Sequence, residues 1–435
     1  MNYDIHSACL GGLTTGFGLV LLSALVASAA PGPIPAPTNS ATNSPPPANT
    51  PILPSGIAGN DNETEWRFVG NLTLQATYDD NISIQPTEEI DDYIFHVAPS
   101  LAFGIGNFRT AIAPYAAIPH FIARTGEEDL PRREYAFASY TPDAVFFSEH
   151  DDENTVNHDV RLAARKEREI WNAHGQLRFQ RVTDADLDAG RRVRQTYYTA
   201  SGAVERSLTG KVFGGIGARG YRAEYAGGNS STDGRGNAYF DYQVAPKTRV
   251  GAGVTAGYLW VEHGADQTYQ QPYVHLVYQP TAKLWFNAQV GEEFRQYDSD
   301  IGDRERVVFA VDSNYDASDA TTFNLTARRE TQSSAQYPDE NIVASLYQAG
   351  VRQRFFQRIY LSLLGGFVRN QYENNAPASV IERRDDFMFY RATTSLDVTR
   401  RGTLELSYEY RDNDSTLPNF DFDQNLVSLR ASFLF

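Results

Sequence analysis

The chain has 435 residues, of which 41% are hydrophobic and 21% are charged, and its formal net charge is −16. The length suits about three ordinary soluble domains. The low mean hydropathy excludes a multi-span helical membrane protein, which needs several apolar runs of about 20 residues. The acidic balance argues against a nucleic-acid partner, which would want a basic face. The 25 Tyr, 25 Phe and 4 Trp, beside 2 Met and 1 Cys, are typical of strands with one apolar and one wet face.

The N-terminal residues predict a secretory signal peptide over 1–29. Residues 10–27 are apolar or small, and Ala27-Ser28-Ala29 forms an Ala-x-Ala cleavage site, so we expect export through the inner membrane. The segment before the apolar run contains Asp4 and no Lys or Arg, which leaves a mis-assigned start codon or a retained anchor as alternatives. Cleavage would remove Cys9, so we expect no disulfide and no cysteine-based metal site.

Residues 30–64 are rich in Pro, Ala, Thr and Asn. Such a segment has too little apolar surface to offset its ordering entropy. We therefore expect a disordered periplasmic linker, which acts as a semi-extended tether.

From residue 65 to 435 apolar and polar residues alternate. Three segments show the pattern most clearly, namely 66–78, 171–180 and 404–411. A period of two over about ten residues predicts strands with one apolar face. The fold class we expect is all-β, with a single domain over 65–435.

The connections alternate in length. Short turns are predicted near residues 166–169, 208–211, 245–248, 280–283, 316–320, 356–358 and 399–402, and the four lysines lie at or beside them. Longer acidic or Gly/Asn-rich loops are predicted at 79–91, 149–155, 183–190, 226–234, 263–266, 298–302, 332–339, 374–384 and 412–419. Short turns at one end and longer loops at the other are typical of an outer-membrane barrel.

The predicted turns and loops separate about eighteen strands, within a range of 16–20. Residues 108–132 are apolar but contain Pro114, Pro119 and Pro131, which disfavour a regular central strand. We expect a long periplasmic excursion there, and a hairpin would raise the count to twenty. The even number predicts a transmembrane antiparallel up-and-down barrel with periplasmic N- and C-termini.

The C-terminal segment 427–435 alternates and ends in an aromatic residue. This ending resembles the C-terminal insertion signal of bacterial outer-membrane β-barrels, and the resemblance implies that Phe433 and Phe435 form an assembly signal read by the barrel-assembly machinery. A soluble sandwich would need several domains and linkers, and none is visible after residue 65, whereas a closed barrel removes its edges and exposes its apolar face to lipid. Many tyrosines lie near strand ends and predict interfacial girdles. They are Tyr225, Tyr239, Tyr242, Tyr258, Tyr269, Tyr278, Tyr297, Tyr347, Tyr360, Tyr390 and Tyr408.

Particular segments also carry a resemblance. The Tyr-Asp-Asp-Asn sequence within 74–82, and the Ala-Pro-Ser-Leu sequence at 98–101, resemble the opening of a family of bacterial outer-membrane β-barrel porins often encoded near exopolysaccharide genes. Residues 140–142 and 146–152 are similar to further segments of that family. The resemblance implies an outer-membrane pore, in some members assisting polysaccharide export, with export components as partners.

The alternate positions of the strands would face the lumen of such a barrel. Facing walls of Arg and carboxylate would set selectivity, although the same residues could pair into salt bridges that fill the lumen. The predicted pore-lining residues are Arg161, Arg165, Arg178, Glu205, Asp241, Trp285, Glu293, Arg295, Arg306, Asp312, Arg328, Arg352, Arg354, Arg391, Asp397, Glu405, Glu409 and Arg430.

Other sites are weaker in the sequence. Trp285 stands beside Asn287 and Gln289 on the same face and could contact a sugar, although a packing role is favoured over sugar contact. We find no motif of an enzyme or cofactor site; Ser148 and His150 are the only close Ser/His pair and lack a third partner. Asp184, Asp186 and Asp188 nearly match a calcium loop, but the turn glycine and distal Glu are missing. We therefore predict no enzyme, cofactor or resident metal.

The leading hypothesis is a bacterial outer-membrane pore that passes polar solutes or polysaccharide. Its partners would be the lipid bilayer and lipopolysaccharide. The alternative is a structural or adhesive surface barrel whose lumen is closed and whose loops bind ligands.

Overall fold

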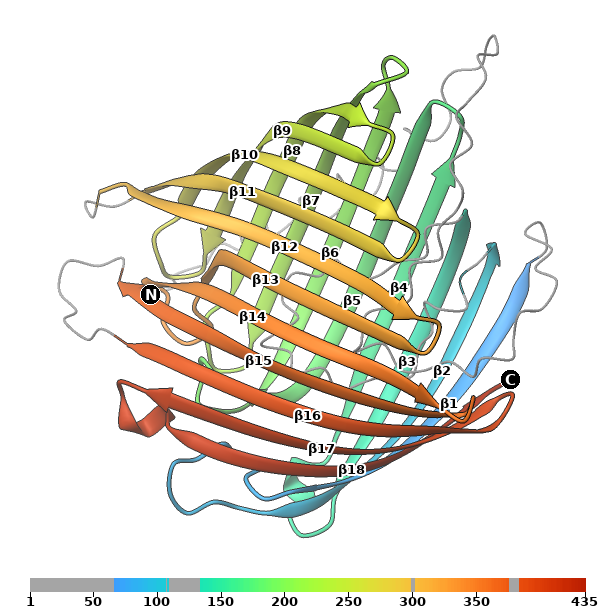
Figure 1. Ribbon diagram of the computed structural model, residues 1–435. Helices are drawn as coiled ribbons and strands as arrows, with labels where there is room; N and C mark the ends of the chain where they lie inside the picture. The colour runs from blue at the N-terminus through green and yellow to red at the C-terminus, as the bar shows by residue number, and fades with distance from the viewer. Residues whose placement is uncertain (1–65, 107, 109–133, 299–301, 375–382) are drawn as a thin grey trace, which may run out of the picture. The chain divides into compact units, whose positions relative to one another are not determined.

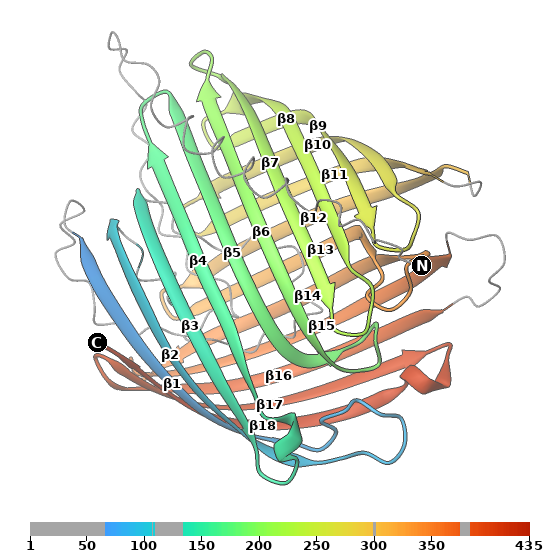
Figure 2. The same cartoon turned by 180° about the vertical axis from the view of Figure 1, so that it is seen from behind.

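The computed structural model describes residues 66–106, 108, 134–298, 302–374 and 383–435. These residues form one 18-stranded antiparallel sheet in which each strand pairs with its neighbours in sequence, and the first strand pairs with the last. The sheet is therefore a closed barrel of up-and-down topology, as predicted (Figure 1, Figure 2). The predicted signal peptide and linker lie outside the described residues, as does nearly all of 108–132.

The strand bounds are as follows: β1 Arg67–Asp79, β2 Asp92–Gly106, β3 Tyr135–Phe147, β4 Thr155–Glu167, β5 Trp171–Asp186, β6 Arg191–Ser207, β7 Val212–Tyr225, β8 Ser231–Ala245, β9 Thr248–Val261, β10 Gln267–Thr281, β11 Leu284–Tyr297, β12 Arg304–Ser318, β13 Thr321–Ser333, β14 Glu340–Phe355, β15 Ile359–Asn374, β16 Arg384–Thr399, β17 Gly402–Ser415 and β18 Phe422–Leu434. Two 3-10 turns, η2 at Asp151–Glu153 and η3 at Pro418–Phe420, lie in loops. Among the described residues no helix is long and apolar enough to cross a membrane.

The barrel closes between β1 and β18. Their register runs from Asn71 opposite Leu434 to Asp79 opposite Leu426. At the end of this seam the backbones of Gly70 and Phe435 exchange hydrogen bonds of 3.4 and 2.8 Å. The seam leaves neither strand with an unpaired edge, which is the condition for a sheet to span a bilayer.

The two faces of each strand differ as the alternation predicts. On β18, the side chains of Val427, Leu429 and Phe433 are exposed on the outer face. On the inner face of the same strand, Gln424 is only 1% exposed. The outer face carries many more exposed aromatic and aliphatic side chains, from Trp66 to Phe435. Such a continuous apolar band is unstable in water and suits the hydrocarbon region of a bilayer.

The predicted tyrosine girdles are only partly confirmed. Tyr242, Tyr278, Tyr347, Tyr390 and Tyr408 are exposed on the outside. The prediction is wrong for Tyr225, Tyr269, Tyr297 and Tyr360, which are buried inside. Their positions in the alternation are inward, where a phenol can satisfy its hydroxyl group with polar neighbours.

The two ends of the barrel differ in their connections. At one end, here called the short-turn end, most strands join through very short turns such as 246–247, 282–283 and 400–401. At the other, the long-loop end, the connections include 80–91, 148–154 and 334–339. The predicted loop 183–190 is wrong in extent, because β5 continues to Asp186 and β6 begins at Arg191.

The outer face provides a direct test of bilayer insertion. We expect Leu429→Arg, on the outer face near the middle of β18, to lower the free energy of unfolding in lipid vesicles by about 2–4 kcal/mol, because a cation at the midplane is costly. Val398→Arg, close to the short-turn end of β16, should cost only about 0–1 kcal/mol. Urea titrations followed by Trp fluorescence measure both. Equal losses of unfolding free energy in the two variants would contradict a membrane midplane at the level of Leu429.

Candidate functional site

The structure places every predicted pore-lining residue on the inward face of its strand, alternate to the exposed apolar positions. Many of them are paired with an opposite charge. Arg178 contacts Asp159 at 2.6 Å, Arg328 contacts Asp312 at 3.2 Å, and Arg249 contacts Glu205 at 3.3 Å. The inner wall is therefore charged but largely compensated in place.

Other predicted residues fit the same pattern. Glu293 is fully buried and contacts Arg295 at 2.9 Å and Arg306 at 3.6 Å. Asp241 contacts His275 at 2.7 Å, and the guanidinium of Arg352 lies 4.6 Å from the ring centre of Tyr360. Inward positions are also occupied by Arg161, Arg165, Trp285, Arg354 and Asp397.

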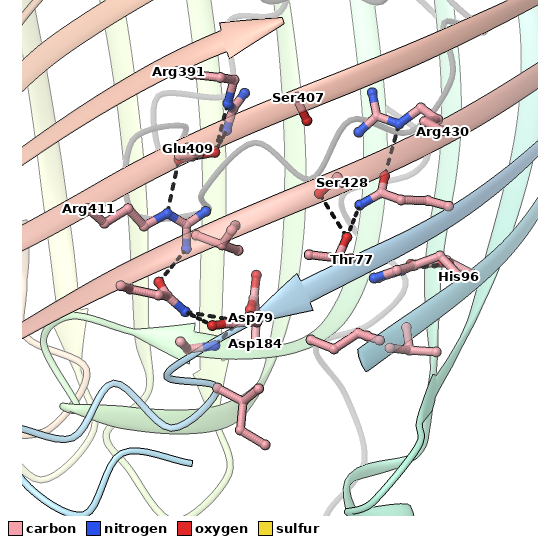
Figure 3. Close-up of a pocket in the computed structure, with 18 of the residues that line it drawn as sticks. Thr77, Asp79, His96, Asp184, Arg391, Ser407, Glu409, Arg411, Ser428 and Arg430 are labelled. Atoms are coloured by element: carbon pink, nitrogen blue, oxygen red, sulfur yellow. Dashed lines mark hydrogen bonds and ion pairs between the residues drawn. The ribbon is translucent and has the colours of Figure 1, made fainter. Parts of the chain in front are cut away.

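A cavity of about 140 Å³ lies inside the barrel. Its lining comes from β1 to β6 and from β15 to β18, so residues distant in sequence face one space. Figure 3 draws lining side chains and labels ten of them. Of the predicted pore-lining residues, the cavity brings together Arg391, Glu405, Glu409 and Arg430. The others lie on the inner wall outside this lining.

One charged row crosses the cavity wall towards the long-loop end. Glu409 is buried and accepts hydrogen bonds from Arg391 at 2.7 Å and from Arg411 at 2.9 Å. Arg411 also donates to Gln424, and Gln424 donates to Asp79 at 2.8 Å (Figure 3). Along the row the side chains are an arginine, a glutamate, an arginine, a glutamine and an aspartate, and each is hydrogen-bonded to its neighbour.

A second charged row lies towards the short-turn end. Arg430 donates to Glu405 at 3.0 Å and to Gln75 at 2.9 Å. Gln75 stands opposite His96 in the register of β1 and β2, and His96 contacts Asp143 at 3.0 Å. The two rows give the cavity a strong local field but leave its arginines paired.

The tip of the β5–β6 hairpin crosses towards the opposite wall at the long-loop end. Leu187, at the tip, belongs to one buried apolar cluster with Leu364 and Val368 of β15 and with Phe387 and Phe389 of β16. These strands lie far from β5 and β6 around the barrel. Figure 2 shows the two strands curving at this end instead of running straight on. The hairpin tip therefore narrows the lumen.

A buried ionic network fastens this tip. Arg383 donates to the backbone oxygens of Leu187 and Asp188, each at 2.8 Å, and contacts the Asp385 carboxylate at 2.7 Å. Asp188 in turn accepts hydrogen bonds from Ser334. Burial alone would lower the pKa of Arg383, but the neighbouring Tyr372 and the two aspartates raise that pKa above its ordinary value. The guanidinium therefore stays charged and holds three segments together.

The calcium-loop residues have other roles in this structure. Asp186 accepts hydrogen bonds from the backbone of Asp188 and from Gln195, and Asp188 belongs to the network of Arg383. Asp184 lies 3.9 Å from Arg192. Within the described residues, no group of three or more His, Cys, Asp or Glu side chains is arranged to hold a metal ion.

The Ser148 and His150 side chains both contact Asp92. Ser148 Oγ donates to the Asp92 carboxylate at 2.8 Å, and His150 Nδ1 lies 2.9 Å from it. Backbone N–H groups of the same loop also point at this buried acid. The arrangement fixes the loop on the start of β2, and it pairs the serine with a carboxylate rather than with a histidine base.

Several cavity residues were not among the sequence predictions. Arg383, which fastens the hairpin tip and lies outside the cavity lining, was missed as well, because it follows a sequence segment without alternation. The alternation along each strand predicts that Thr393, Ser407 and Ser428 face inward. Alternation alone does not predict which residues of different strands lie at the same level in the barrel. Only the register between strands reveals that grouping.

Residues 279–434 match the family model described as "Putative beta-barrel porin 2". The match covers the part of the chain from the end of β10 to β18 and agrees with the predicted resemblance to β-barrel porins.

No curated protein matches the sequence significantly. Among solved structures, outer membrane protein opdK from Pseudomonas aeruginosa is 12% identical, with a TM-score of 0.42 over 85% of this chain and 99% of that one. OccAB4 from Acinetobacter baumannii is 12% identical, with a TM-score of 0.42 over 87% and 100%. OccK2 (OpdF) from Pseudomonas aeruginosa is 9% identical, with a TM-score of 0.46 over 85% and 98%. The barrel of this chain is defined by its own strand pairing.

The network at the hairpin tip predicts a local effect of Arg383. We expect Arg383→Gln to speed amide hydrogen exchange over residues 183–192 by about a hundredfold or more, because the buried aspartates lose their cation. The neighbouring variant Arg384→Gln is the control, since this half-exposed side chain lies 3.6 Å from Asp386 and outside the network. Mass spectrometry of the folded barrel measures both. Unchanged exchange in Arg383→Gln would show that the tip is held by packing alone.

Proposed function

We propose that this chain is an outer-membrane pore that passes polar solutes through a lumen lined by Arg, Asp and Glu. The observation that carries the proposal is the cavity inside the barrel, whose polar lining comes from opposite walls. The outer face is apolar and the inner face is polar, as a water-filled transmembrane channel requires. At eighteen strands a barrel is wide enough for an aqueous channel.

The pattern of ion pairs bears on the class of solute. Because Arg391, Arg411 and Arg430 each contact a carboxylate or an amide of the wall, the cavity presents dipoles and hydrogen-bonding groups rather than one net charge. We infer weak selection between small anions and cations. In this proposal the chain has a transport role and no catalytic one.

We also propose which end of the barrel faces the periplasm. The short-turn end would face the periplasm, because short turns are typical of that side, and the lysines Lys211, Lys247 and Lys283 lie in those turns. The long-loop end would face outwards, towards lipopolysaccharide. Recognition of Phe433 and Phe435 by the assembly machinery, contacts with export components and assistance to exopolysaccharide export stay predictions.

A second function is favoured by one observation. The tip of the β5–β6 hairpin is fastened across the lumen by Arg383, and such a plug suits a closed surface barrel whose loops bind ligands. Planar-bilayer recording of the full chain separates the two functions. Reproducible steps of open-channel current are expected for the pore, whereas their absence from membranes that contain folded barrel would support the closed one.

The charged row predicts how selectivity changes. We expect Glu409→Gln to shift the zero-current potential in a salt gradient towards anions, because Arg391 and Arg411 lose their shared acid. Glu292→Gln is the matched control, since it removes one negative charge from the outer face of β11. An unchanged potential in Glu409→Gln, with the barrel folded and conducting, would show that current bypasses this cavity.

A further inference from the structure

A row of hydroxyl side chains crosses the inner wall of the barrel at one level. Each of five neighbouring strands, from β15 through β18 to β1, contributes one hydroxyl group. The strand register places them side by side in the order Ser362, Thr393, Ser407, Ser428 and Thr77. All five line the cavity, and Figure 3 labels three of them. We call this set the hydroxyl row.

The hydroxyl row lies between the two charged rows. One step along the inward positions towards the long-loop end leads from Ser407 to Glu409, and one step the other way leads to Glu405. Both glutamates already contact arginines of the wall, at 2.7 and 3.0 Å. The charged groups of the two charged rows are therefore paired within their own rows, and the hydroxyl row lies between them.

The members of the row differ in their contacts. Thr77 and Ser428 are hydrogen-bonded to each other at 2.9 Å, and Gln75 donates to Thr77 at 2.8 Å. Among the described residues, no side-chain hydrogen bond engages Ser362, Thr393 or Ser407. These three hydroxyl groups stand on consecutive strands and are partly exposed to the cavity.

We propose that the hydroxyl row is a binding site for a neutral carbohydrate within the lumen. The inference rests on the proposed pore function and adds the substrate class. Each hydroxyl group can donate one hydrogen bond and accept two. Neighbouring strands lie about 4.8 Å apart, so a solute with hydroxyl groups along its length meets wall hydroxyls at a regular spacing.

The surrounding charges favour a neutral solute over a charged one. A carboxylate or an ammonium group bound here would compete with ion pairs that are already formed, and breaking such a pair leaves one charge unsatisfied. The β5–β6 hairpin bounds the same space, because Thr183 and Asp184 of β5 and Arg192 of β6 line the cavity. A solute that passes the tip is thereby brought close to the wall that carries the row.

The test uses the full chain in planar bilayers, with maltotriose as the neutral probe and galacturonate as the charged one. Maltotriose should block the ion current in a saturable way, and galacturonate should block it more weakly. The double variant Thr393→Val with Ser407→Ala should bind maltotriose about tenfold more weakly, since it loses two neutral hydrogen bonds. Ser201→Ala is the matched control, because this inward serine of β6 does not line the cavity.

Three outcomes would overturn the proposal while the channel still conducts. Maltotriose could fail to block, it could block the double variant as tightly as the unaltered chain, or galacturonate could block more strongly. Titration calorimetry of detergent-solubilised barrel with maltotriose separates this proposal from the pore function. Binding that the double variant weakens supports the site even without conductance, whereas no binding by the folded barrel overturns it.

Discussion

The pairing of β1 with β18 is the interaction on which the rest of this structure depends. A bilayer offers no water to unpaired backbone groups, so a sheet can span it only when every edge is closed. The seam from Asn71 to Asp79 supplies that closure, and the ring of Phe435 packs so close to Gly70 that a Cβ atom there would lie 3.0 Å from it. Once the sheet is closed, the alternation of apolar and polar residues along each strand places the apolar face against lipid and the polar face against the lumen.

The inner face shows how a charged lumen can be stable. Acids and bases stand on neighbouring strands at the same level, as Arg391 does opposite Glu409 and Glu405 opposite Arg430. Such cross-strand pairs compensate buried charge and also brace the wall. They leave room between them for neutral hydrogen-bonding groups, and this arrangement connects the stability of the barrel to the class of solute we propose.

Much of the barrel could be predicted from the sequence, because strand number and facing follow from local alternation. Eighteen strands, the short turns at the lysines and the inward position of the charged residues needed no tertiary information. The β5–β6 hairpin could not be predicted. Asp184 to Gly190 have the composition of a solvated loop, but β5 continues to Asp186, and Leu187 and Asp188 find partners in distant parts of the chain. The hydroxyl row was missed for a related reason, since register between strands is set by pairing and not by periodicity.

The most direct test of the central claim compares two neighbouring residues of β17, Ser407 on the inner face and Leu406 on the outer face. Each is replaced by cysteine in a Cys9→Ser background, and the barrel in lipid vesicles is treated with a charged, membrane-impermeant maleimide. The account predicts rapid labelling of cysteine at position 407 and little labelling at 406, because one position faces a water-filled lumen and the other faces lipid. Equal labelling at both positions, or an unreactive cysteine at 407, would contradict it.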